Sequence, residues 1–114
     1  MHGARRWYFP DGYLPTGRKG HHTSHESLCV LNVNERTARV RVWVFFSDRD
    51  PLEFEVEVPP RRDVHLRMEN FGIPRGIPYG LMLESDLPVV AQLSRLDVGI
   101  CRYSLMGSSG YWEE

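Results

Sequence analysis

Two consecutive segments in the middle of the chain alternate strictly in side-chain character. In 38–46, every second residue is alanine, valine or phenylalanine, and in 52–58 apolar residues alternate with glutamate. A period of two is the pattern of β-strands that bury one face. Because Ser47 to Pro51 between them has turn chemistry, the sequence predicts a β-hairpin of 38–46 and 52–58.

The charges of this hairpin suggest its register. Pairing Phe46 with Leu52 superimposes the valine faces and places Arg41 opposite Glu57. Such cross-strand pairs contribute only roughly 0.2–1 kcal/mol each, but they help to fix the register. The outer face of the second strand then carries an acidic stripe, formed by Glu53, Glu55 and Glu57.

The rest of the chain shows the same strand-and-turn pattern. Pro10-Asp11-Gly12 predicts a turn, and the Pro- and Gly-rich segment 69–80 predicts a long loop. No window has convincing helical spacing, and roughly six to eight short strands are typical of a sandwich or barrel. We predict an all-β antiparallel sandwich in one domain, 1–114, with further strands at 24–32, 61–68, 81–84 and 89–97, and with a shorter apolar segment at 100–106.

The segment 24–32 joins a polar entrance to an apolar run. Leu28 to Leu31 is unbroken in its apolar character, which favours a strand buried on both faces. Such a strand would hold Ser24, His25 and Glu26 at its entrance in fixed positions, as a binding site requires. The alternative is a polar strand start that satisfies nearby backbone groups, and these residues alone favour that alternative.

Composition and signals restrict the class of protein. Of 114 residues, 41% are apolar and 25% charged, which describes a globular protein. A net charge of -1 gives no field that would attract nucleic acid or acidic lipid, so neither is an expected partner. Because no secretory signal and no apolar run of ~20 residues is visible, we expect a cytoplasmic protein. Cys29 and Cys101 lie in apolar contexts and are predicted to be buried core residues in a reducing compartment.

The sequence offers two further possibilities, a metal site and a catalytic triad, and neither is favoured. His21, His22, His25 and Glu26 could ligate a metal, but no second cluster matches, so solvated loop histidines are favoured and no cofactor is expected. A Ser24-His25-Asp97 triad lacks a Gly-x-Ser-x-Gly turn. Adjacent strand residues also point to opposite faces, so we expect no catalytic activity.

Arg95 is the most informative single charge. It follows the apolar start of the strand 89–97, and the planar guanidinium suits recognition of carboxylates or vicinal oxygens. Pairing with Asp97 or Glu26 is the structural alternative. The sequence weights the two interpretations equally.

Several motifs together resemble a known family. They are Gly12–Pro15, Ser24–Asn32, Phe46–Asp48, Val58–Arg62, Ile77–Pro78 and Pro88–Asp97. In these motifs the chain resembles the sensory rhodopsin transducer family, small partners first associated with a cyanobacterial sensory rhodopsin. The resemblance runs from Trp7 to about Tyr111 and weakens after Asp97.

The resemblance implies a jelly-roll-like sandwich that assembles as a cyclic homotetramer and has no enzymatic activity. It implies a signalling adaptor that docks on a membrane photoreceptor. A basic loop of that receptor would suit the acidic stripe, and the alternative interpretation of the stripe is a solvated face. The alternative to the adaptor is a free-standing sensor that binds a small polar molecule such as a sugar.

Two further expectations concern surfaces. In the family's sandwich, several polar residues are expected to converge on a pocket for a polyhydroxylated or anionic ligand. They are Ser24, His25, Glu26, Arg62, His65, Arg95 and Asp97. The second expectation is a homo-oligomer, because the chain holds more aromatic surface than a lone small domain usually exposes. The aromatic residues concerned are Trp7, Tyr8, Phe9, Tyr13, Trp43 and Phe45.

Overall fold

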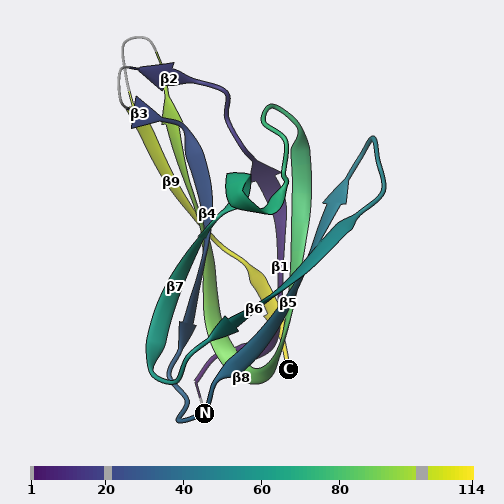
Figure 1. The fold of residues 1–114 in the computed structure, drawn as a ribbon, viewed down its shortest axis with the longest axis vertical. Coiled ribbons are helices and arrows are strands. Elements are labelled where there is room, and N and C mark those ends of the chain that lie inside the picture. The colour runs from purple at the N-terminus through teal and green to yellow at the C-terminus, as the bar shows by residue number, and fades with distance from the viewer. Residues whose placement is uncertain (1, 20–21, 100–102) are drawn as a thin grey trace.

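A computed structural model describes residues 2–19, 22–99 and 103–114. Nearly all regular structure in this part of the chain is β-strand (Figure 1). The strands are β1 (Ala4–Tyr13), β2 (Arg18–Lys19), β3 (His22–Thr23), β4 (His25–Asn32), β5 (Ala38–Phe46), β6 (Leu52–Val58), β7 (Arg62–Arg67), β8 (Pro78–Val98), β9 (Tyr103–Ser109) and β10 (Tyr111–Glu113). A short 3₁₀ helix, η1 (Met68–Phe71), follows β7.

The strands form two layers that share β8. The first half of β8 lies between β1 and β5, which gives a first layer in the order β10-β1-β8-β5-β6. Its second half lies between β4 and β9, which gives a second layer in the order β9-β8-β4-β7. All these pairings are antiparallel, and buried side chains from both layers form the core. The predicted all-β antiparallel sandwich is therefore confirmed.

The continuity of β8 differs from the prediction of two strands separated by a turn at 85–88. The chain stays extended and passes from one layer to the other at this point. Among the described residues, 86–88 have no ladder partner, so the missing N–H of Pro88 leaves no ladder bond unmade. The indole N–H of Trp7 donates a hydrogen bond to the Val89 carbonyl at 3.0 Å, which links β1 to β8 where β8 passes between the layers.

The central hairpin forms as predicted, but its register is shifted by two residues. Val44, not Phe46, pairs with Leu52, and Arg41 therefore lies opposite Glu55. A shift of two preserves the faces, so the acidic stripe stays on the outside. The hairpin loop is longer than predicted, because Phe45 and Phe46 pair with Gly80 and Tyr79 of β8 and not with β6. Phe46 also lies edge-on to Tyr79, with ring centroids 6.3 Å apart.

Between Leu28 and Leu31, the strand β4 is buried on one face only. Leu28 and Val30 are fully buried, whereas Leu31 is 39% exposed and Cys29 is half-buried. The prediction of burial on both faces was wrong because β4 lies in an outer layer whose second face meets solvent. Cys29 is therefore not a core residue, and Cys101 lies outside the described residues.

Three other segments correct the sequence interpretation. Pro10-Asp11-Gly12 is a β-bulge within β1 and no turn, since Phe9 pairs with Leu81 but Gly12 with Tyr79. The predicted loop 69–80 begins in η1 and ends where β8 starts at Pro78. The apolar segment 100–106 overlaps β9, which runs from Tyr103 to Ser109, and 100–102 lie outside the described residues.

Candidate functional site

The bulge in β1 directs backbone groups toward the start of β4. The extra residue beside Asp11 turns the Asp11 carbonyl and the Tyr13 amide toward β4 and β8. Gly12 is required there, because a Cβ atom at this position would lie 2.4 Å from Cε1 of the Tyr79 ring. The absence of a side chain lets Tyr79 pass close to β1 and reach the interior.

Glu26 is the polar centre of the sandwich. It is fully buried, and its Oε1 accepts hydrogen bonds from the Tyr13 amide at 3.0 Å and from the Tyr79 hydroxyl. Its Oε2 accepts from Nε of Arg95 at 2.9 Å. Burial raises the pKa of Glu26 above its usual value, against the lowering effects of Tyr79, Arg95 and Tyr13. Burial together with the adjacent carboxylate raises the pKa of Tyr79 as well, so its hydroxyl remains a donor.

Arg95 closes this buried centre from β8. Its side chain is only 12% exposed, and Nη2 donates to the Asp11 carbonyl at 2.7 Å. The guanidinium carbon also lies 5.9 Å from the centre of the Tyr13 ring, within the range of a cation–π contact. Of the two interpretations of Arg95, pairing with Glu26 is the contact in the structure. A ligand role stays a prediction.

Ser24 supports the same region from the entrance of β4. Its buried Oγ accepts the Val98 N–H at 2.8 Å, which ties β4 to the end of β8. From the loop before β8, Nη1 of Arg75 donates to the carbonyls of Ser24 and Pro15 at 2.7 and 2.8 Å. The serine hydroxyl thus has a backbone-satisfying role, in line with the alternative interpretation of this segment.

A small cavity lies beside the Glu26–Arg95 pair. Its volume is about 230 Å³, and it is lined by Asp11, Glu26, Leu93, Arg95, Met106, Gly107 and Ser108. Nε and Nη2 of Arg95 are occupied, while Nη1 has no hydrogen bond to any described residue. The Arg95 guanidinium, the carboxyl groups of Asp11 and Glu26, and residues of β9 therefore surround this space.

Five of the predicted site residues do not line this cavity: Ser24, whose contacts are described above, and four others. Arg62 pairs with Asn32 at the far end of β4, so the predicted convergence with Glu26 is wrong for Arg62. His65 pairs with Cys29 on the solvent face, and its Nε2 lies 2.9 Å from Oδ2 of Asp63. The other two are His25, whose Nδ1 contacts the Thr23 carbonyl at 3.3 Å, and Asp97, which is exposed.

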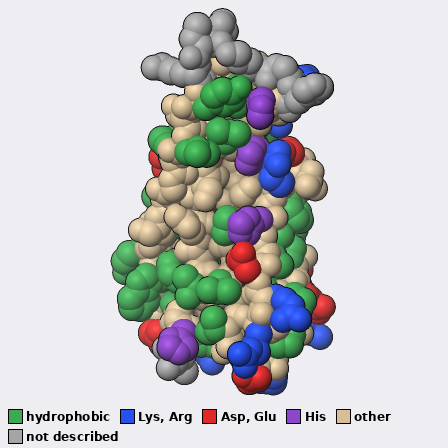
Figure 2. All heavy atoms as spheres, turned by 90° about the vertical axis from the view of Figure 1, so that its left-hand side faces the viewer, with side chains coloured by type: hydrophobic (Ala, Val, Ile, Leu, Met, Phe, Trp, Pro, Cys, Tyr) green, Lys and Arg blue, Asp and Glu red, His purple; other side chains and the backbone are tan. Residues whose placement is uncertain are grey.

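The histidines of this side of the molecule are spread along its length (Figure 2). Among the described residues, no group of histidine, cysteine, aspartate and glutamate could hold a metal ion. His21 of the weighed metal cluster lies outside those residues.

Sequence reasoning missed Tyr79, Tyr13 and Arg75 as members of this site. Tyr79 stood in a segment interpreted as loop, and Tyr13 contributes through its backbone amide. Only Gly12 carried a usable signal, because a glycine within a strand pattern often marks a bulge or a close backbone approach. The glycine thus indicated a close contact at position 12, but it did not indicate that Tyr79 makes that contact.

Fold and site together define an all-β sandwich protein built around a buried carboxylate–guanidinium pair. The family model described as Anabaena sensory rhodopsin transducer matches residues 2–112, and the chain belongs to that family. The resemblance inferred from the motifs is thereby confirmed.

Solved structures agree with the family assignment. The crystal structure of Thermotoga maritima 1070 is 53% identical, with a TM-score of 0.97, and the match covers 100% of this chain and 98% of that one. The Anabaena sensory rhodopsin transducer is 31% identical, with a TM-score of 0.74, over 85% of this chain and 91% of that one. No curated protein sequence matches the chain significantly. No helix in the described part of the chain is long and apolar enough to cross a membrane.

Proposed function

We propose that this protein is a cytoplasmic, non-enzymatic signalling adaptor that docks on a membrane photoreceptor of the sensory rhodopsin type. The observation that carries the proposal is the family match over residues 2–112, together with the similarity to the Anabaena sensory rhodopsin transducer. An adaptor needs surfaces rather than reactive groups. The polar groups of the site fit this role, because Glu26 and Arg95 are engaged with each other and with the backbone, and Ser24 with the backbone.

The test is photo-crosslinking in retinal-loaded membranes of the source organism. A photoreactive amino acid is placed at exposed positions of both layers, and crosslinked partners are identified by mass spectrometry. We expect a retinal-binding membrane protein as the main product, with a yield that changes on illumination. Crosslinks only to other proteins, or none above a membrane-free control, would contradict the adaptor function.

A second candidate function is binding of a small polar ligand beside Arg95. The cavity of about 230 Å³ favours it, since Arg95 and Asp11 offer the groups that suit a polyhydroxylated or anionic molecule. Residues of the predicted pocket outside the cavity are not part of this proposal.

Thermal unfolding with a panel of sugars and small carboxylates tests this candidate. Asp11→Asn changes a side chain that is 83% exposed, so the fold should be retained while any ligand-induced increase in Tm is lost. Asp63→Asn, on the solvent face of β7, is the matched control and should keep the increase. If no compound raises the Tm of the unaltered protein, this second function is rejected.

A further inference from the structure

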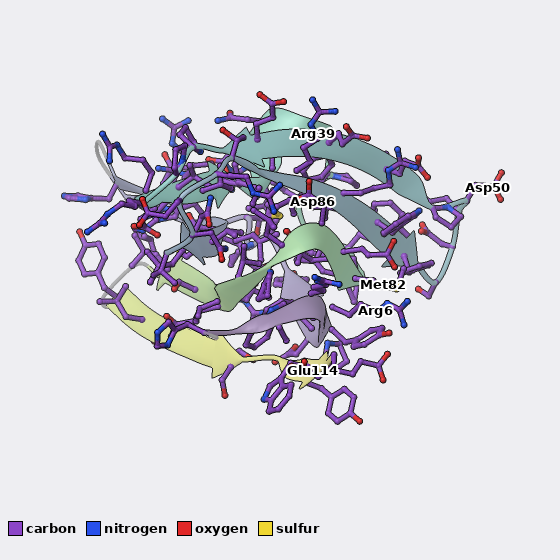
Figure 3. The ribbon with its side chains drawn as sticks, turned by 90° about the horizontal axis from the view of Figure 1, so that it is seen from below. Arg6, Arg39, Asp50, Met82, Asp86 and Glu114 are labelled. Carbon is purple, nitrogen blue, oxygen red and sulfur yellow. The ribbon has the colours of Figure 1, made fainter. Side chains whose placement is uncertain are left out.

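The outer face of the first layer carries a row of alternating charge. In register across β10, β1, β8, β5 and β6 lie Glu113, Arg6, Glu84, Arg41 and Glu55. Three of the four adjacent pairs form ion pairs: Arg41 with Glu55 at 2.7 Å, Arg6 with Glu84 at 3.2 Å and Arg6 with Glu113 at 4.0 Å. In Figure 3, labelled side chains from β5, β8 and β1, and that of Glu114 just after β10, follow one another across this end of the molecule.

An aromatic row runs alongside the charged row, one pleat further along the strands. Tyr111, Tyr8, Met82 and Trp43 are in register across β10, β1, β8 and β5. Tyr111 is 68% exposed, and Phe45, two residues beyond Trp43 on the same face, is 43% exposed. Aromatic residues, methionine and arginine are the types enriched in protein–protein interfaces, from which lysine is depleted. The single lysine of the chain, Lys19, lies elsewhere, in β2.

The face is hollowed on both sides of β8. One groove of about 410 Å³ lies toward β5 and is lined by Arg39, Arg41, Trp43 and Glu55 along with Glu84, Ser85 and Asp86. A second, of about 280 Å³, lies toward β1 and the C-terminus and shares Glu84, Ser85 and Asp86. The two carboxylates of β8 therefore border both grooves.

Carboxylates outnumber guanidinium groups on this face, so some carboxylates remain in excess even if every guanidinium group is paired with one. The acidic members are Glu53, Glu55, Glu57, Glu84, Asp86, Glu113 and Glu114, and the basic members are Arg5, Arg6, Arg39 and Arg41. This excess repels the phosphates of nucleic acids and of acidic lipids, and it attracts cationic side chains.

We propose that the charged row, the aromatic row and the two grooves form the docking surface for a basic segment of a partner protein. Its lysine or arginine side chains enter the grooves beside Glu84 and Asp86, and its apolar side chains lie on the aromatic row. This inference deepens the proposed adaptor function and rests on it for the identity of the partner, a cytoplasmic segment of the receptor.

The first test uses a fluorescent decapeptide in which arginine alternates with leucine, and its binding is followed by fluorescence anisotropy. We expect binding that weakens at least tenfold when NaCl is raised from low to high concentration. The double variant Glu53→Lys and Glu84→Lys should weaken binding at least tenfold, and Trp43→Ala several-fold. Both changed carboxylates are about half exposed, and an unchanged melting curve checks the fold.

The matched control reverses a carboxylate away from this face. Glu35, 79% exposed in the turn between β4 and β5, is changed to Lys, and binding should stay within about twofold of the unaltered protein. Absence of peptide binding, equal binding by the double variant, or preferential binding to vesicles rich in phosphatidylserine would overturn the proposal. So would loss of a homo-oligomer in the double variant without loss of peptide binding, since the face would then be a self-interface.

Failure of the docking surface and failure of the adaptor function can be told apart. If the double variant still crosslinks to a retinal protein as the unaltered chain does, the adaptor function stands and this surface is rejected. If the peptide binds here but no receptor is crosslinked, the surface stands and the adaptor function is rejected.

Discussion

Glu26 shows how one buried carboxylate can organise the end of a sandwich. Donors reach it from three directions: the Tyr13 amide in β1, the Tyr79 hydroxyl near the start of β8 and the Arg95 guanidinium near its end. A buried charge is tolerated only when its partners compensate for lost hydration. The stability of the site therefore depends on each donor remaining in place.

Replacing Arg95 by Met should destabilise the protein strongly. Because Glu26 is fully buried, loss of its ion-pair partner leaves an uncompensated carboxylate, and we expect the free energy of unfolding at neutral pH to fall by about 3–5 kcal/mol. Urea unfolding followed by circular dichroism measures it. The control is Arg39→Met, in a pair with Glu57 whose side chains are 70% and 65% exposed. It should cost less than about 1 kcal/mol, and equal losses in the two variants would contradict the prediction.

The cost of Arg95→Met should also depend on pH. Arg95 lowers the pKa of Glu26, so its loss moves that pKa further above the unfolded value. A carboxyl whose folded pKa is raised binds a proton more tightly when folded, so its contribution to stability is present at low pH and is lost as pH rises through the folded pKa. The stability gap between wild type and Arg95→Met should therefore be smaller at about pH 5 than at about pH 7.5. An equal gap at both pH values would show that the loss does not arise from the unpaired charge.

The Tyr79 hydroxyl can be tested by a matched pair of substitutions. Tyr79→Phe removes a buried donor to Glu26 and should cost about 1–3 kcal/mol. Tyr8→Phe removes a donor to Glu113 on the surface, at 2.6 Å, where water can replace it, and should cost less than about 1 kcal/mol. Chemical denaturation of both variants gives the comparison, and a larger cost for Tyr8→Phe would rule out this account of the site.

At the scale of elements, the bulge of β1 is what joins the two layers at this end. It directs the Asp11 carbonyl to Arg95 and the Tyr13 amide to Glu26, so a local irregularity in one layer completes the polar centre of the other. A regular strand would have aimed these groups at its ladder neighbours instead.

Gly12→Ala should disrupt this bulge. The new Cβ atom would lie 2.4 Å from the Tyr79 ring and 2.7 Å from the Tyr79 carbonyl oxygen, and backbone cannot easily move aside. We expect a loss of about 1–3 kcal/mol from overpacking. Gly80→Ala, in the neighbouring strand, meets nothing closer than 3.6 Å and should be nearly neutral. Thermal unfolding compares the two, and a neutral Gly12→Ala would mean that the bulge does not need glycine.

At the scale of the whole molecule, the aromatic residues expected to drive assembly are not all on the surface. Trp7 and Phe9 are core residues, 7% and 1% exposed, so they contribute no surface. Exposed apolar side chains remain on both layers, among them Leu31, Val90 and Leu105 on the second. Leu105 is 81% exposed in β9, which pairs only with β8 among the described strands.

Assembly therefore stays a prediction, now with a different surface. We expect a homotetramer whose mass is four times 13.3 kDa by light scattering. Leu105→Glu places a charge on the outer side of an edge strand and should reduce that mass. The β-sheet circular dichroism spectrum should stay unchanged, which shows that the fold is kept. Phe45→Glu, on the outer face of the first layer, is the comparison and should leave the mass unchanged. A monomer for the unaltered chain at micromolar concentration would contradict the prediction.

Local alternation alone predicted the hairpin, the outward acidic stripe and the all-β class, because the direction of a strand side chain depends only on its own backbone. The motif strings likewise sufficed to indicate the family. The hairpin register could not be predicted, because the pairing with β6 ends at Val44 while Phe45 and Phe46 continue beside β8, a strand distant in sequence. The continuity of β8 could not be predicted either, because the sequence shows only a proline and turn residues at 85–88. In the structure, Trp7 of β1 donates a hydrogen bond to β8 just after this segment, at the Val89 carbonyl. The pairing of Glu26 with Arg95 and the row from Glu113 to Glu55 required the order of strands across both layers, which tertiary packing decides.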